Sequence, residues 1–108
     1  MLVKTIDRNL IANIHLDRIM YVESMGNQCT FNLKDGKQIV CYISLKQIKE
    51  RMPDLVRVSG SVLINELELR SVRKLGAYAY MKMSNGEKLK IPKSSGYLKD
   101  FLNSDYCD

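Results

Sequence analysis

Polar and apolar residues alternate along much of this chain with a period of two, which is typical of half-buried β-strands. The segment Cys29-Thr30-Phe31-Asn32-Leu33 alternates in this way, and Lys88-Leu89-Lys90-Ile91 does so strictly. Other β-rich or apolar runs predict an edge strand over 10–15, a short buried run over 62–64, and strands over 19–23, 39–43, 55–58, 69–75 and 78–83. The pattern therefore predicts a mainly β domain.

Two glycine-containing turns join these strands into hairpins. Asp35-Gly36 separates two strand-like runs, and Asn85-Gly86 precedes the last one; glycine accepts the positive φ of such turns without steric cost. A register centred on residues 35–36 places Cys29 opposite Cys41, with both thiols facing the core. The strands are expected to pair antiparallel, because the chain lacks the βαβ rhythm of a nucleotide-binding fold.

Helical spacing interrupts the strand pattern in two places. A helix is predicted over 45–52, between a candidate N-cap at Ser44 and the helix-breaking Pro53. A second short helix is predicted over 97–102, after candidate caps at 94–95. The expected fold class is mainly β, with small antiparallel sheets and two or three short helices.

Length and composition indicate one globular domain over residues 1–108, with a polar tail at 103–108 that is expected to fray. No apolar run is long enough to span a membrane, and the first residues do not form a signal peptide. The three cysteines are odd in number and lack metal-type spacing, so we expect reduced thiols, a cytoplasmic location, and neither metal nor cofactor.

The chemistry of an enzyme is missing from the sequence. The chain has no Gly-rich phosphate loop and no zinc-protease motif. His15 lacks a visible nucleophile and orienting partner, which favours a structural histidine, and Glu23 lacks a second carboxylate at a recognisable spacing. The sequence therefore predicts neither catalysis nor a small-molecule substrate.

The positive charge is concentrated in the middle of the chain. Residues 34–99 hold fourteen Lys and Arg against six Asp and Glu, within a net charge of +5 for the whole chain. The basic residues form three groups: Lys34 with Lys37; Arg70, Arg73 and Lys74; and Lys88, Lys90 and Lys93. This surplus indicates either a polyanionic partner or a solvated basic surface.

Two features sharpen the choice of partner. The segment 90–95 combines lysines with hydroxyls ahead of the predicted final helix, an arrangement suited to phosphate. Tyr78 and Tyr80 share one face of a strand, where they serve either as a stacking platform for a single-stranded nucleic acid or as packing residues of the sheet.

The order of five pieces is more specific than any of them alone. Tyr21-Val22-Glu23-Ser24-x-Gly26-Asn27 is followed by the Asp-Gly hairpin and the helix beginning at Ser44-Leu45. Then come Leu55-Val56-Arg57-Val58-x-x-Ser61-x-x-Ile64-Asn65 and, later, Asn85-Gly86-x-x-Leu89-x-Ile91-Pro92-Lys93. In this order, over about residues 8–102, the chain resembles the LytTR-type DNA-binding domain.

The resemblance implies small antiparallel sheets and a role in bacterial transcription regulation, often as the output domain of a two-component response regulator. It implies double-stranded DNA as partner, bound at direct repeats in promoters through loops in the major groove, with a possible homodimer on DNA. The chain is then either a stand-alone regulator or an excised output domain. The implied DNA-contacting residues are Asn27, Gln28, Arg57, Ser59, Gly60, Ser61, Lys93 and Ser94.

Two departures from the family pattern leave an alternative open. The segment that usually reads Arg-x-His-Arg-Ser has Ser59 and Gly60 in place of the His and the second Arg, and Lys93 replaces an arginine. Losing a base-reading cation costs about 1–3 kcal/mol of discrimination. The alternative is a protein-interaction module, or a dominant-negative partner of a LytTR regulator, with weak non-specific DNA binding.

Overall fold

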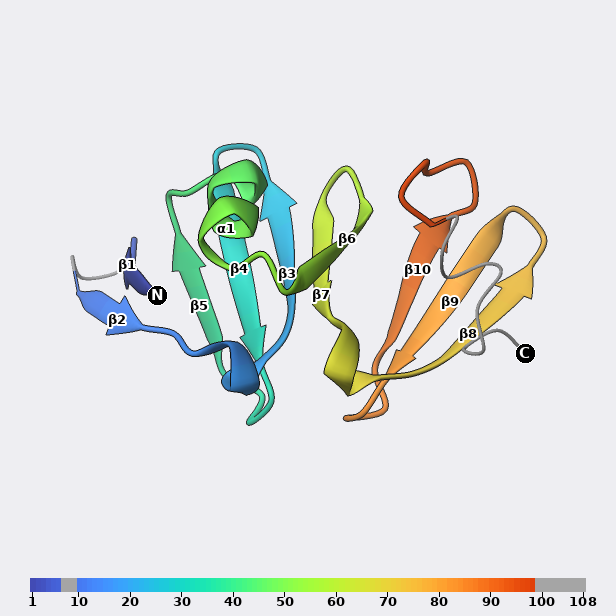
Figure 1. Ribbon diagram of the computed structural model, residues 1–108, viewed down its shortest axis with the longest axis horizontal. Coiled ribbons are helices and arrows are strands. Elements are labelled where there is room, and N and C mark those ends of the chain that lie inside the picture. Colours follow the sequence, from blue (N-terminus) through green and yellow to red (C-terminus); the bar gives the residue numbers. More distant parts are fainter. Residues whose placement is uncertain (7–9, 99–108) are drawn as a thin grey trace.

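The chain folds into three antiparallel sheets set side by side along an elongated molecule of 42 × 25 × 20 Å (Figure 1). The computed structural model describes residues 1–6 and 10–98. The strands are β1 (Leu2–Lys4), β2 (Ile11–Asn13), β3 (Ile19–Met25), β4 (Gln28–Leu33), β5 (Gln38–Cys41), β6 (Leu55–Ser59), β7 (Val62–Asn65), β8 (Leu69–Leu75), β9 (Tyr78–Met83) and β10 (Lys88–Pro92). The prediction of a mainly β fold is confirmed.

The five-stranded sheet, ordered β5-β4-β3-β7-β6, occupies the middle of the molecule. Its β4–β5 hairpin has Cys29 paired with Cys41 and Asn32 with Gln38, so the register is centred on Asp35 as predicted. Gly36 takes a φ of 88° in that turn, a conformation that side chains with a Cβ rarely adopt. The two-stranded sheet β1-β2 and the three-stranded sheet β10-β9-β8 flank this sheet.

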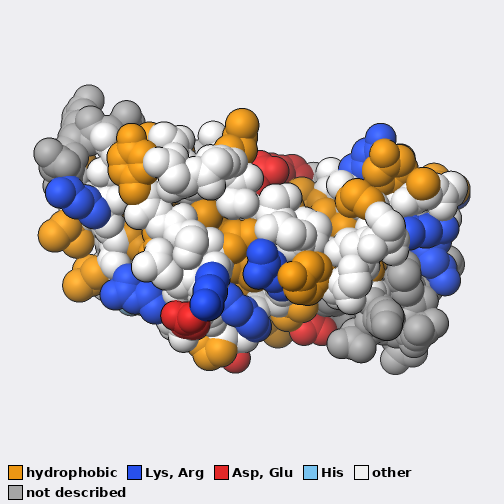
Figure 2. Space-filling model, turned by 90° about the horizontal axis from the view of Figure 1, so that it is seen from above, with side chains coloured by type: hydrophobic (Ala, Val, Ile, Leu, Met, Phe, Trp, Pro, Cys, Tyr) orange, Lys and Arg blue, Asp and Glu red, His pale blue; other side chains and the backbone are white. Residues whose placement is uncertain are grey.

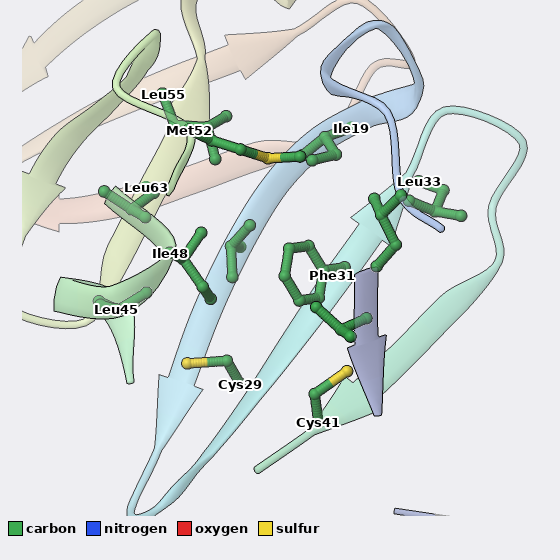
Figure 3. Packing of buried hydrophobic residues seen from close by; sticks show 13 residues of the cluster. Ile19, Cys29, Phe31, Leu33, Cys41, Leu45, Ile48, Met52, Leu55 and Leu63 are labelled. Carbon is green, nitrogen blue, oxygen red and sulfur yellow. The ribbon is translucent and has the colours of Figure 1, made fainter. Parts of the chain in front are cut away.

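The first core lies between α1 (Leu45–Arg51), β1 and one face of the five-stranded sheet. Ile48 of the helix, Phe31 of β4 and Leu63 of β7 all have no exposed surface there (Figure 3). Cys29 and Cys41 line the same cluster as free, buried thiols. Covering this face requires an apolar stripe on α1, which explains the helical spacing in the sequence.

The second core lies on the other face of the same sheet, against the inner face of β8-β9-β10. Ala79, Met81 and Met83 point into it, as the alternation of β9 predicts. Strands β3 and β7 therefore lie between two cores, and four consecutive residues in each, at 19–22 and 62–65, are buried. This explains why these two strands lack the polar and apolar alternation of an exposed sheet.

Helix α1 begins and ends where the sequence predicts. Ser44 caps it: the Ser44 side chain accepts from the Gln47 backbone N–H at 3.1 Å, and the Gln47 side chain accepts from the Ser44 backbone N–H. Lys49 Nζ donates to the carbonyls of Pro53 and Leu55, which fixes the chain as it leaves the helix. Among the described helices, none is long and apolar enough to cross a membrane.

The predicted final helix does not begin at Tyr97. Tyr97 lies in a turn, in which the Leu98 N–H donates to the Ser95 carbonyl at 3.3 Å, and the rest of the predicted helix falls outside the described residues. Two short 3-10 helices, η1 (Leu16–Arg18) and η2 (Glu66–Glu68), lead into β3 and β8 instead. The hydrophobic pattern of the sequence predicts neither of these two helices.

Candidate nucleic-acid interface

Three loops that hold predicted DNA-contacting residues lie at one edge of the molecule, the upper edge in Figure 1. They are the β3–β4 turn, the β6–β7 turn and the loop that follows β10. The Ser24 N–H donates to the Ser61 carbonyl at 2.8 Å, which joins the first two. The Ser95 hydroxyl donates to the Val58 carbonyl at 2.9 Å, which joins the last two. We call residues 25–28, 59–61 and 93–97 the loop edge.

The β3–β4 turn presents two amide side chains. Asn27 is exposed at the tip of the turn, and Gln28 is half-buried at the start of β4. Both side chains can donate and accept hydrogen bonds, the combination that recognises an adenine edge. The sheet pairing of Met25 with Gln28 holds this turn in place.

Arg57 organises the β6–β7 turn from within. Its Nε donates to the Ser59 carbonyl at 3.2 Å and its Nη2 to the Gly60 carbonyl at 2.9 Å. The guanidinium lies over the Tyr97 ring, 5.1 Å from the ring centre. Arg57 therefore contacts its own turn and the neighbouring loop, and the remaining guanidinium donors are left for a ligand.

The three residues that follow Val58 differ in what they present to solvent. Ser59 is only 8% exposed, and its hydroxyl accepts from the Ser61 N–H at 3.2 Å. Gly60 is exposed without a side chain, and Ser61 is exposed with its hydroxyl near that of Ser59. At the positions where the family pattern has His and Arg, this turn therefore presents backbone groups at Gly60 and a Ser59 hydroxyl that points into the turn.

The loop after β10 completes the edge. The Lys93 N–H donates to the Ala77 carbonyl at 2.9 Å; the Lys93 residue is half-buried, and Ser94 is exposed. A shallow groove of about 400 Å³ separates this loop from the β6–β7 turn and is lined by Ser59, Gly60, Ser61, Pro92, Ser94, Ser95 and Tyr97. Since no helix begins at residues 94–95, the described residues provide no helix N-terminus for phosphate here.

Two ion pairs lie at the opposite edge of the molecule. Lys34 Nζ lies 3.4 Å from Glu68, whose carboxylate also accepts from the Ser84 hydroxyl at 2.7 Å. These contacts, the Ser84 hydrogen bond first, hold the pKa of Glu68 below its usual value. Arg18 lies 3.4 Å from Asp35 in the same region. The Lys34 group is therefore partly neutralised. Figure 2 looks down on the loop-edge side of the molecule, where Lys and Arg side chains are spread from one end of the face to the other.

Asn65 has a structural role that the sequence did not reveal. Its side-chain amide is buried and donates to the carbonyls of Leu16 and Ile19, at 3.1 and 3.0 Å. Its carbonyl oxygen accepts from the Leu67 N–H at 3.2 Å. Asn65 thus connects η1, β3 and η2 through its side chain.

Tyr97 belongs to the loop edge although the sequence did not point to it as a site residue. The sequence pattern predicts a helix beginning at Tyr97, whereas the structure places its ring against Arg57.

These features define a class: a small antiparallel β domain whose exposed loops bring amide, hydroxyl and cationic side chains to one edge. Residues 9–104 match the family model of the LytTr DNA-binding domain, and the chain belongs to this family. The function of this family is DNA binding in transcription regulation.

The fold is also that of a solved relative. The chain is similar to the LytTr DNA-binding domain of a protein described as a methyl-accepting/DNA response regulator, from Bacillus cereus, with a TM-score of 0.77 and 18% identity. The match covers 96% of each chain. A search of curated proteins finds no match.

Proposed function

We propose that the loop edge binds duplex DNA sequence-specifically, with its loops in the major groove of direct-repeat promoter sites. The observation that carries this proposal is the hydrogen-bonded junction of the three loops, through Ser24 with Ser61 and Ser95 with Val58. The three loops follow one another along the long axis of the molecule, so they can contact successive positions of one duplex (Figure 1).

The residues divide into readers, phosphate contacts and supports. Asn27 and Gln28 are the base readers, since their amides match adenine. Ser61, Lys93 and Ser94 contact phosphates, with Lys93 as a point charge rather than a bidentate group. Arg57 holds the β6–β7 turn and offers its remaining donors to DNA. The protein is proposed to act in the cytoplasm as a bacterial regulator without catalytic activity, two copies occupying paired repeats.

A second candidate function follows from the β6–β7 turn. Ser59 is turned inward and Gly60 has no side chain, so this turn offers fewer base-reading groups than the family pattern. A domain with this turn could instead bind a protein partner, such as a LytTR regulator. It would then bind DNA only non-specifically, with a Kd of about 10⁻⁴–10⁻⁶ M at physiological salt.

Selection of duplexes from a genomic-fragment pool separates the two functions. Sequence-specific binding predicts an enriched repeated motif and a salt-dependent affinity measured by fluorescence anisotropy. Lys93→Ala should lower the salt slope on the selected duplex by about 0.9, the value expected for one phosphate contact. Lys37→Ala, in the β4–β5 turn of the opposite edge, is the matched control and should leave the slope unchanged. Absence of any enriched motif would overturn the proposal.

A further inference from the structure

The outer face of the three-stranded sheet, turned away from the second core, is strongly basic. Arg73, Lys82, Lys88 and Lys90 are exposed there. Strands β8, β9 and β10 contain no acidic residue to balance them. None of these cations belongs to the loop edge, so the duplex-binding proposal does not account for them.

The sheet register sets these charges against each other. Lys82 and Lys88 are direct cross-strand partners, an arrangement that destabilises a sheet through repulsion of like charges. This pair does not stabilise the fold through packing, because both side chains lie outside the core. A bound anion would relieve the repulsion, and the pair therefore points to a ligand.

Aromatic rings lie among the cations. Tyr80 pairs with Arg73 on one side and with Lys90 on the other. Lys90 Nζ lies 4.1 Å from the centre of the Tyr78 ring, and Tyr78 is 36% exposed. A hollow of about 410 Å³ has Tyr80, Arg73, Lys82 and Lys88 in its lining, a size within the range of small-ligand sites. Three cationic side chains and an aromatic ring thus line one hollow.

We propose that this outer face binds a single-stranded nucleic acid, with Tyr80 stacking a base and the four cations contacting phosphates. The Tyr78 ring holds Lys90 through its cation–π contact, and Lys90 is the cross-strand partner of Tyr80, so this contact keeps a cation beside the stacking ring. In a duplex, the stacked bases would not expose their faces to Tyr80, so the ring favours an unpaired strand.

Anisotropy with a labelled oligothymidylate of about 12 nucleotides tests the proposal, because this strand cannot form a duplex with itself. Tyr80→Val should weaken its binding about 5- to 150-fold, and Tyr80→Phe, which keeps the ring, should stay within about twofold. Lys88→Ala should lower the salt slope by about 0.7. It should not lower the Tm, since it removes a repulsive pair, and this confirms that the variant is folded.

Three results separate this proposal from the duplex proposal. Loss of oligothymidylate binding in Tyr80→Val, with binding to the selected duplex intact, supports a second site. No binding of oligothymidylate by the wild-type protein, or equal binding by Tyr80→Val, overturns it. Weaker duplex binding in Lys88→Ala, with unchanged oligothymidylate binding, also overturns it and makes the face a contact for the backbone of duplex DNA. Lys93→Ala tests the loop edge independently.

Discussion

The hydroxyl of Ser95 donates to the backbone carbonyl of Val58 over 2.9 Å, across 37 residues of sequence. Val58 lies in the strand that leads into the β6–β7 turn, and Ser95 lies in the loop after β10. A single side chain therefore links two loops that belong to different sheets. We expect the relative position of these loops to depend on this bond.

We predict that Ser95→Ala weakens duplex binding several-fold and lowers the free energy of unfolding by about 0.5–1.5 kcal/mol, because the carbonyl of the buried Val58 loses this partner. Urea denaturation and anisotropy on the selected duplex measure the two effects. Ser95→Thr keeps the hydroxyl and should restore most of the affinity. Equal affinity of Ser95→Ala and the wild-type protein would show that the bond does not position the loops.

Replacing two asparagines should affect two different properties, the stability of the fold for Asn65 and duplex binding for Asn27. Asn65→Ala removes the buried amide that bonds to Leu16 and Ile19, and it should lower the free energy of unfolding by about 2–3 kcal/mol. Asn27→Ala, at an exposed turn, should change stability by less than about 0.5 kcal/mol and should weaken duplex binding. Urea denaturation of both variants is the measurement. A stable Asn65→Ala protein would contradict the structural role.

The stability should fall in acid partly through Glu68. Because the Ser84 hydrogen bond and Lys34 lower the pKa of Glu68 in the folded protein, its contribution is present above the ordinary pKa and is lost as the pH falls through the folded value. Glu68→Gln should therefore lower the free energy of unfolding at neutral pH, by less than about 1 kcal/mol because the group is partly screened by solvent. Its difference from wild type should shrink as the pH falls below the ordinary glutamate pKa of about 4.3.

Urea denaturation of both proteins across this pH range is the test. The exposed Glu50→Gln on α1 is the matched control, with an expected effect under about 0.5 kcal/mol. A gap between Glu68→Gln and wild type that stays constant from neutral to acid pH would remove Glu68 from the acid response.

The two core thiols should be unreactive in the folded protein. Burial, reinforced by the neighbouring Cys29, raises the pKa of Cys41 to about 11, and burial also raises the pKa of Cys29. Since the thiolate is the reactive form, alkylation at about pH 8 should modify neither residue until urea unfolds the protein. Peptide mapping after alkylation reports both sites. Rapid labelling of either thiol without urea would contradict the packing of the first core.

The raised thiol pKa values also predict a loss of stability in alkali. The folded protein favours the neutral thiols, so their contribution is complete below the ordinary cysteine pKa of about 8.5 and is lost as the pH rises toward about 11. Thermal unfolding followed from neutral to alkaline pH should show the Tm falling over this interval. A Cys41→Ala variant should show a smaller alkaline fall, whatever its Tm at neutral pH.

Local patterns in the sequence predicted the hairpins and the helix. Asp35-Gly36 set both the turn and the register that pairs Cys29 with Cys41, because a two-strand register follows from the turn residues. Ser44 and Pro53 likewise placed the ends of α1 within one residue. The loops of the candidate site were found through the family resemblance, and the structure brings them together.

Contacts between distant segments could not be predicted. Strand β1 has one buried residue, Val3, and forms by pairing with β2, so no local pattern indicates it. The bonds from Arg57 to its own turn depend on backbone carbonyls that no sequence pattern places, and its contact with Tyr97 depends on the docking of two loops. The same holds for Asn65, whose partners are 46 and 49 residues away.

Backbone amide chemical shifts of the isotope-labelled protein, recorded while the selected duplex is added, report which surface contacts DNA. We expect the largest changes at Asn27, Gln28, Ser61 and Ser94, and little change in the turns at 34–37 and 84–87 of the opposite edge. Changes concentrated in those two turns, with the loop edge unaffected, would contradict DNA recognition by the loop edge.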